Sequence, residues 1–283
     1  MPIKFNLQLS PECIFSEWDL LSGRQKVVTA IAYLYLQQEK NAQRVIDDLD
    51  TVTVQPKGKI VANIVRKLTA AKGEDVARLM DPDPKVRKSA QNKINSDTWA
   101  RDGLLFQHIS WIAVRLQMPG AHMTPPHVRQ SDKGFDGFIV DIDPTDNTLT
   151  RLVLCEDKAS HDPRNLITQS VWAEIRDIVG GGRDDQITAG IINLVRALPE
   201  IDEEEFINDI FWGDDREFRV SVATGEDIRK DGFFGHLMEG FEKAAGGKHE
   251  SRVGAVLAFP EVRSGLQSLA DEVLQKVEEI ANV

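Results

Sequence analysis

The sequence predicts a mixed α/β fold in which a mainly helical region precedes a larger α/β region. Apolar residues recur at helical spacing through much of the first hundred residues, and apolar runs typical of strands begin only after residue 134. From there helical and strand patterns alternate to the end of the chain. The 283 residues suffice for one large domain or two modest ones, and the 41% hydrophobic content is typical of a folded chain.

The N-terminal region reads as helix. Residues 20–38 and 58–72 carry Val, Ala, Ile and Leu at helical spacing. Residues 73–98 are polar, turn at Asp81-Pro82-Asp83-Pro84 and predict a short basic helix over residues 85–93. We therefore divide the chain into a mainly helical region, residues 1–97, and a second domain, residues 98–283.

The second domain opens with an apolar-striped helix over residues 98–117. Residues 135–142 and 151–159 predict two strands joined by a turn, that is, a hairpin. Beyond the hairpin we expect helices over residues 165–179, 184–198, 232–245 and 264–281, and strands over residues 218–223 and 253–259.

The hairpin carries the residues best suited to catalysis. Asp136 lies early in its first strand, and Glu156 and Lys158 end the second. Residues two apart on a strand face the same way, so these side chains are expected to meet. Two carboxylates favour Mg²⁺ or Mn²⁺, and a neighbouring lysine suits phosphodiester hydrolysis by water. Asp132 and Asp141 compete for the role of Asp136.

These residues resemble the PD-(D/E)XK nuclease superfamily. The match rests on Gly134-Phe135-Asp136-Gly137 and on Leu152-Val153-Leu154-Cys155-Glu156-Asp157-Lys158, and it covers roughly residues 98–198. The resemblance implies a restriction-endonuclease-like core of helix, antiparallel hairpin, helix and strand, with a helical N-terminal region and extra C-terminal α/β elements. It also implies a metal-dependent deoxyribonuclease that hydrolyses DNA.

The resemblance assigns a role to each site residue. Asp136 and Glu156 would bind Mg²⁺ or Mn²⁺, and the main-chain carbonyl of Asp157 would complete the metal site. Lys158 would assist the attacking water. Gln169, on the following helix, would position Lys158 or the phosphate.

One position departs from the superfamily pattern. Many members carry a glutamate on the helix before the first strand, whereas Gln107 or His108 aligns there. Either side chain is a weaker metal ligand than a carboxylate, so the number of metal ions stays open.

The layout of a helical N-terminal region, a nuclease core and additional α/β elements resembles anti-phage defence nucleases of the Hachiman HamA type. That resemblance implies a helicase or ATPase as protein partner. The formal net charge of -11, from 34 Lys and Arg against 45 Asp and Glu, argues against a uniformly basic nucleic-acid platform. Any contact with DNA is therefore expected to be local.

The cysteine count and the absence of long apolar runs predict where the protein acts and which kinds of site it lacks. The two cysteines argue against a disulfide framework or a cysteine metal site. No apolar run approaches the roughly 18 residues of a membrane helix, and the N-terminus lacks a secretory pattern, so we expect a cytoplasmic protein without a membrane partner. The rival hypothesis is a catalytically inactive nuclease-fold protein that acts as a DNA- or protein-binding regulatory subunit. The choice of DNA or RNA, the strandedness, the cut site and the oligomeric state stay open.

Overall fold

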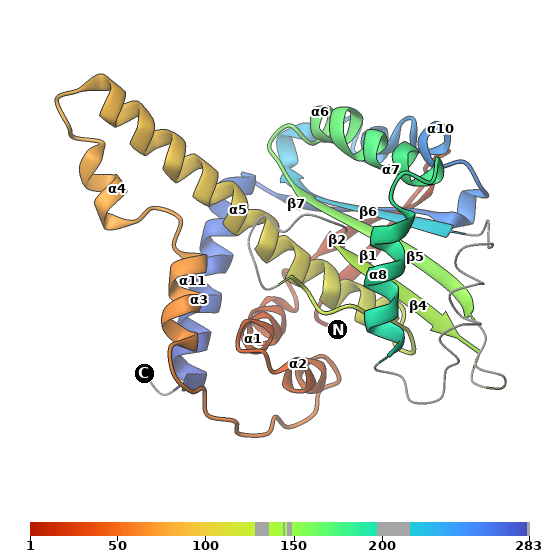
Figure 1. The fold of residues 1–283 in the computed structure, drawn as a ribbon, viewed down its shortest axis with the longest axis horizontal. Helices are drawn as coiled ribbons and strands as arrows, with labels where there is room; N and C mark the ends of the chain where they lie inside the picture. The colour runs from red at the N-terminus through yellow and green to blue at the C-terminus, as the bar shows by residue number, and fades with distance from the viewer. Residues whose placement is uncertain (128–135, 144, 146–148, 197–215, 282–283) are drawn as a thin grey trace.

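A seven-stranded mixed sheet forms the centre of the molecule (Figure 1). The computed structural model describes residues 1–127, 136–143, 145, 149–196 and 216–281. The strand order is β1-β2-β7-β6-β5-β4-β3, so the expected α/β class is confirmed. The strands are β1 (Lys4–Gln8), β2 (Ile14–Asp19), β3 (His122–Met123), β4 (Gly137–Ile142), β5 (Leu149–Ala159), β6 (Arg216–Gly225) and β7 (Arg252–Phe259).

The sheet combines antiparallel edges with a parallel centre. Strands β3, β4 and β5 form an antiparallel meander, and β1 pairs antiparallel with β2. Strands β5, β6, β7 and β2 run parallel to one another. The predicted hairpin is β4–β5, and the predicted strands over residues 218–223 and 253–259 lie within β6 and β7.

Strands β1 and β2 were not predicted from the sequence, although Phe5 and Leu7 alternate with polar residues in the way typical of a strand. Each has only five or six residues and mixes apolar with polar side chains. The partner of β2 is β7, where Ile14 lies opposite Val253, so the pairing that stabilises β2 is remote in sequence.

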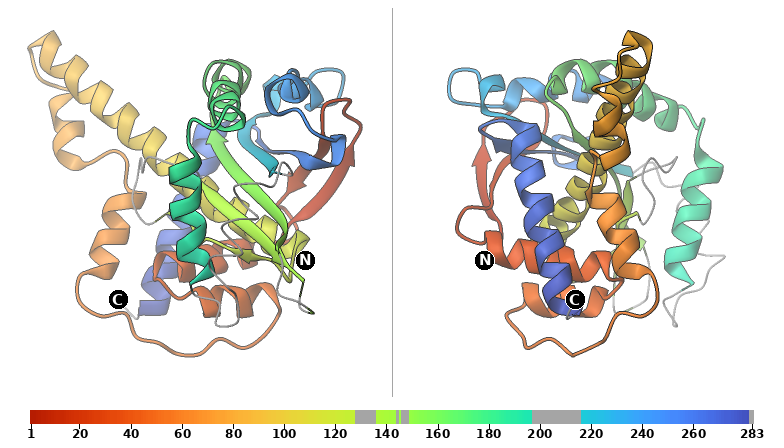
Figure 2. Two further views of the ribbon diagram at one scale, coloured as in Figure 1. Left: turned by 45° about the vertical axis from the view of Figure 1, so that its right-hand side comes forward. Right: turned by 90° about the vertical axis from the view of Figure 1, so that its left-hand side faces the viewer.

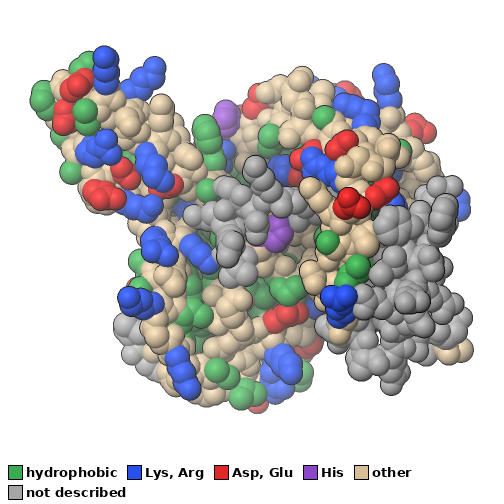
Figure 3. Space-filling view, viewed as in Figure 1, with side chains coloured by type: hydrophobic (Ala, Val, Ile, Leu, Met, Phe, Trp, Pro, Cys, Tyr) green, Lys and Arg blue, Asp and Glu red, His purple; other side chains and the backbone are tan. Residues whose placement is uncertain are grey.

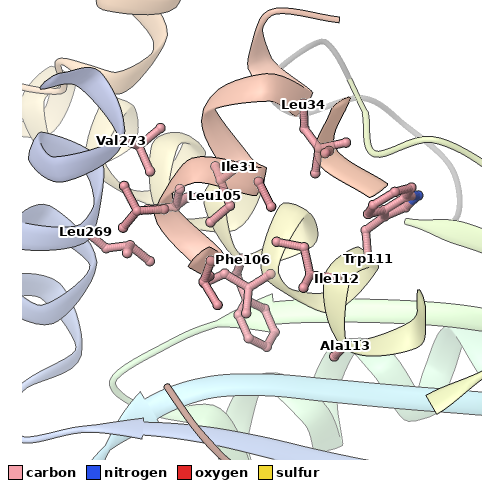
Figure 4. Close-up of a cluster of buried hydrophobic side chains, with 14 of the residues drawn as sticks. Ile31, Leu34, Leu105, Phe106, Trp111, Ile112, Ala113, Leu269 and Val273 are labelled. Atoms are coloured by element: carbon pink, nitrogen blue, oxygen red, sulfur yellow. The ribbon is translucent and has the colours of Figure 1, made fainter. Parts of the chain in front are cut away.

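Two helical layers cover the two faces of the sheet (Figure 2). Side chains alternate between them, because Val153 and Cys155 of β5 enter one core and Leu152 and Leu154 enter the other. The first core lies between the sheet and helices α1, α5 and α11, and Figure 4 shows part of it. Helices on this side are α1 (Arg24–Tyr35), α2 (Glu39–Ile46), which packs on α1, α3 (Ile60–Leu68), α5 (Pro84–Gln117) and α11 (Val262–Ala281).

The second layer follows the hairpin along the chain. Helix α6 (Pro163–Leu166), the π-helical turn η1 (Ile167–Val171) and α7 (Trp172–Val179) run on without a break, and α8 (Asp184–Val195) follows. The helix expected over residues 232–245 is interrupted at Gly240, whose φ is 86°. The pieces are the 3₁₀ helix η3 (Gly235–Met238) and α10 (Phe241–Ala245); two further 3₁₀ helices are η2 (Glu226–Ile228) and η4 (His249–Ser251).

Helix α5 is one continuous helix of 34 residues that crosses the boundary expected at residues 97 and 98. Asp83 caps it by accepting a hydrogen bond from the backbone N–H of Lys85 at 2.8 Å, and Pro84 occupies the first turn. Among residues 84–100 only Ala90 is buried. This half of α5 packs against α4 (Gly73–Arg78) and projects from the body of the molecule (Figure 1). We call α4 and residues 84–100 the arm.

A buried charge network fastens α5 to α11 where the arm meets the body. Arg101 and Asp102 are 1% and 0% exposed, and Arg101 Nη2 donates to Asp102 Oδ1 at 2.6 Å. Arg263 of α11 donates to the other carboxylate oxygen of Asp102, also at 2.6 Å.

Across the part of the chain that the structure describes, no helix has both the length and the apolar character needed to cross a bilayer.

Candidate functional site

The β4–β5 hairpin brings Asp136, Glu156 and Lys158 together, as the sequence predicted. Asp136 immediately precedes β4, where Gly137 lies opposite Cys155. Antiparallel pairing therefore sets Asp136 beside Glu156. Lys158 follows two residues later on the same side of β5.

Lys158 bridges the two carboxylates. Its Nζ donates to Glu156 Oε1 and lies 3.7 Å from Asp136 Oδ2. Asp136 Oδ2 also accepts a hydrogen bond from the backbone N–H of Asp157 at 2.7 Å. The three side chains are 10%, 11% and 25% exposed for Asp136, Glu156 and Lys158, so the cluster is largely withdrawn from solvent but open at the lysine.

Burial and proximity shift the proton affinities of this cluster. Burial, together with the neighbouring Asp136 carboxylate, raises the pKa of Glu156 to about 8. Burial alone would lower the pKa of Lys158, but the Glu156 and Asp136 carboxylates outweigh it and raise that pKa, so the lysine stays protonated. Two carboxylates thus share a single internal cation.

Gln107 of α5 completes the cluster from the helical layer. Its Nε2 donates to Asp136 Oδ1, so both oxygens of Asp136 are held by protein donors. The amide oxygen of Gln107 is buried without a hydrogen-bond partner among the described residues. Of the two residues considered for the helix position, Gln107 is therefore the one that contacts Asp136, and it acts as a donor to the carboxylate.

The side chain of Asp157 lies on the opposite face of the sheet from the side chains of its neighbours Glu156 and Lys158. Its side chain enters the α5 side of the sheet, and burial together with Asp136 raises its pKa to about 7. Its contact with the cluster is made by the backbone, through the N–H bonded to Asp136. The side chain itself is no part of the group formed by Glu156 and Lys158.

The structure does not bring Gln169 to the cluster. It lies on the π-helical turn η1, where its side chain is exposed and makes no hydrogen bond to any described residue. Of the two competitors for the role of Asp136, Asp141 lies at the far end of β4 opposite Arg151. Asp132 lies outside the described residues, as do Gly134 and Phe135 of the motif.

The sequence analysis missed Glu174 on α7. Its charge raises the pKa of both Glu156 and Lys158, and it lines a small cavity with Glu156. Arg183 lies 3.3 Å from the Glu174 carboxylate. The signal that could have found it is helical phase, because Glu174 lies between the buried Val171 and Ile178 on the helix that follows the motif.

His108, the other residue considered for the helix position, faces away from the site. Its ring stacks on Tyr35 of α1 at 4.3 Å with an interplanar angle of 5°, and its Nδ1 lies 2.7 Å from the carbonyl oxygen of Leu104. Burial lowers the pKa of His108 to about 4, with Lys67 and His127 acting in the same direction.

The lowered pKa makes His108 an acid-sensitive point of the fold. The unfolded imidazole takes up its proton near pH 6.5 and the folded one only near pH 4, so this contribution is complete above pH 6.5 and is lost as the pH falls toward 4. Between pH 7 and pH 4 we expect the free energy of unfolding to fall by about 3 kcal/mol less in His108→Phe than in the wild type. Urea unfolding at pH 7 and at pH 4 measures this difference, and His161→Gln, at an exposed position, is the control. Equal losses in the wild type and His108→Phe would contradict it.

The donor set determines what the site can hold. Carboxylates and backbone carbonyls are the ligands preferred by Mg²⁺ and Mn²⁺, and the largely buried Asp136 and Glu156 lie side by side with one lysine between them. Among the described residues no three His, Cys, Asp or Glu side chains converge on one point. The residues fit a divalent cation held by two carboxylates and completed by backbone or solvent oxygens.

Comparisons with protein-family models, with curated proteins and with solved structures find no match for this chain.

Proposed function

We propose that the protein is a metal-dependent deoxyribonuclease that hydrolyses phosphodiester bonds at the Asp136, Glu156 and Lys158 cluster. The observation that carries the proposal is the convergence of these three side chains at the end of one hairpin, with Lys158 within reach of both carboxylates. Paired carboxylates beside a lysine suit attack of water on a phosphodiester.

The order of elements supports a restriction-endonuclease-like core. Helix α5 precedes the β3–β4–β5 meander, α6 and α7 follow it, and β6 then pairs parallel with β5. This is the sequence of helix, antiparallel strands, helix and strand that the resemblance implies. Strands β1, β2 and β7 would extend that core along the sheet.

Asp136 and Glu156 would hold Mg²⁺ or Mn²⁺, with the carbonyl of Asp157 as a further oxygen ligand. The bound cation supplies Lewis-acid catalysis at the phosphate. Gln107 holds the orientation of Asp136 through its amide. Lys158, released from Glu156, presents Nζ to a phosphate oxygen or to the attacking water, and its raised pKa keeps it in the donor form. Gln169 would contact Lys158 or the phosphate only if the turn that carries it moved toward the substrate.

The test is cleavage of supercoiled and linear DNA with Mg²⁺, with Mn²⁺ and with EDTA. We expect cation-dependent nicking by the wild type and none by Glu156→Gln, which keeps the shape of the side chain and removes its charge. The exposed Glu278→Gln on α11 is the matched control. Cleavage by Glu156→Gln at the wild-type rate would refute the site.

Gln107 is expected to act through Asp136. Gln107→Leu removes the donor to Asp136 Oδ1, and loss of such a supporting hydrogen bond typically costs about 10- to 100-fold in metal affinity or activity. We expect cleavage to fall by that factor and the Mn²⁺ titration to shift to higher concentration. Gln91→Leu on the exposed part of α5 is the control. An unchanged Mn²⁺ titration would mean that Gln107 plays no positioning role.

The resemblance in layout supports a role as the effector of a bacterial anti-phage defence system with a helicase or ATPase partner. Co-purification with a helicase or ATPase, where one is encoded beside this gene, tests that part separately. A second candidate is an inactive nuclease-fold subunit that binds DNA or protein. Gln107 favours it, because the helix side chain nearest to Asp136 is an amide and not a third carboxylate. Failure to bind Mn²⁺ would decide for this candidate.

A further inference from the structure

One face of α5 stays open from the tip of the arm to the candidate site. Its members recur every three or four residues and therefore lie along one side of the helix. All are exposed or half-buried, and a Cβ added at Gly103 would meet no atom within 4 Å. The face consists of Lys85, Lys88, Asn92, Ser96, Trp99 and Gly103, and it ends at Gln107.

The charge of this face is opposite to that of the rest of the protein. The face holds two Lys and no Asp or Glu, whereas the whole chain carries 34 Lys and Arg against 45 Asp and Glu. Neither Lys85 nor Lys88 forms an ion pair with any described residue. The acids of this stretch of α5 lie off the face, because Asp97 pairs with Lys72 and Lys93 and Asp102 is buried.

The face is continuous with the site and has a defined length. Its last member, Gln107, donates to Asp136, so the face ends in direct contact with the cluster. At 1.5 Å per residue, Lys88 and Lys85 lie about 28 and 33 Å from Gln107. One turn of duplex DNA is about 34 Å long. Figure 3 shows the notch between the arm and the body of the molecule.

We propose that the arm is a duplex-DNA guide: the open face of α5 lies along the DNA, and Lys85 and Lys88 bind its phosphate backbone about one helical turn from the bond held at the candidate site. The inference rests on the proposed function, since it takes DNA to be what reaches Gln107. A straight helix of this length suits a stiff duplex, and an acid-free lysine pair suits phosphate. The exposed Trp99, 56% accessible, lies on the same face between the lysines and the site.

The test is binding of a labelled 30-bp duplex in EDTA, where no cleavage occurs, over a series of salt concentrations. Lys85→Ala/Lys88→Ala keeps good helix formers at both positions. We expect at least tenfold weaker binding at 150 mM salt and a slope of log K against log salt that is smaller by about 2. An 8-bp hairpin duplex, about 27 Å long, is shorter than the about 33 Å from Gln107 to Lys85, so the variant should lose less affinity for it than for the 30-bp duplex. Duplex binding should also quench fluorescence that Trp99→Phe removes.

The matched control is Lys243→Ala/Lys248→Ala, which removes the same charge from exposed positions around α10. The proposal would be overturned by an equal loss of affinity in the control variant, by an unchanged salt slope, or by an equal loss of affinity for the hairpin. Unchanged duplex binding would also overturn it and would indicate that the face binds a protein partner. Arm-dependent binding that favours a 30-nt single strand would overturn the choice of duplex. If the lysine pair controls duplex binding but the wild type cleaves nothing in Mg²⁺ or Mn²⁺, the proposed function fails and the guide stands.

Discussion

Lys158→Met is expected to abolish cleavage while strengthening cation binding. Loss of the proton donor should lower the cleavage rate by about 10²- to 10⁴-fold. At the same time, removal of the ammonium that now occupies Glu156 and lies 3.7 Å from Asp136 frees both carboxylates, so the Kd for Mn²⁺ should fall by about tenfold. Cleavage assays and Mn²⁺ titration by electron paramagnetic resonance measure the two effects on the same samples.

The opposite signs of the two effects make the result specific. A variant that merely misfolds loses both cleavage and Mn²⁺ binding, and Lys243→Met at an exposed position should change neither. Wild-type cleavage by Lys158→Met would remove Lys158 from the mechanism. Weaker Mn²⁺ binding in a folded variant would mean that the lysine supports the cation site and does not compete for it.

Asp102→Ala is expected to have the largest effect on stability. It leaves Arg101, 1% exposed, and Arg263 without their shared carboxylate at the base of the arm. Removing one partner of a buried ion pair typically costs about 3–5 kcal/mol, because an uncompensated charge stays buried. We expect the unfolding free energy in urea to fall by that amount.

The control for Asp102 is Asp97, which pairs with Lys72 and Lys93 near the surface of the same helix. Asp97→Asn should cost no more than about 1 kcal/mol, as exposed ion pairs do. A loss at Asp102 no larger than that at Asp97 would show that the buried network contributes little net stability.

The sequence was sufficient to predict that the three central residues of the candidate site lie together. Asp136, Glu156 and Lys158 belong to one hairpin, and strand parity alone brings their side chains to one place. Gln169 and Glu174 depend on how a helix packs against the sheet. A π-helical turn, Ile167–Val171, precedes α7 and changes the helical phase, so local spacing could not decide which of the two faces Glu156.

The fold was harder to predict from the sequence where strands pair with partners that are distant along the chain. Strands β6 and β7 are apolar runs and could be predicted from the local sequence, whereas β2 depends mainly on pairing with β7. The arm was missed for another reason. Residues 89–100 are mostly polar and lack an apolar stripe, so the sequence pattern predicted two separate helices where capping at Asp83 and packing on α4 sustain a single long one.

The pairing of β2 with β7 has a consequence for the timing of folding. β2 ends at Asp19 and β7 at Phe259, so β2 cannot pair with β7 until residues as far as Phe259 have left the ribosome. Contacts so distant in sequence slow folding and leave the first strands without their neighbour during synthesis. Burst-phase and pulse-labelling experiments should therefore find the protection of β1 and β2 against hydrogen exchange arriving last, after the β4–β5 hairpin.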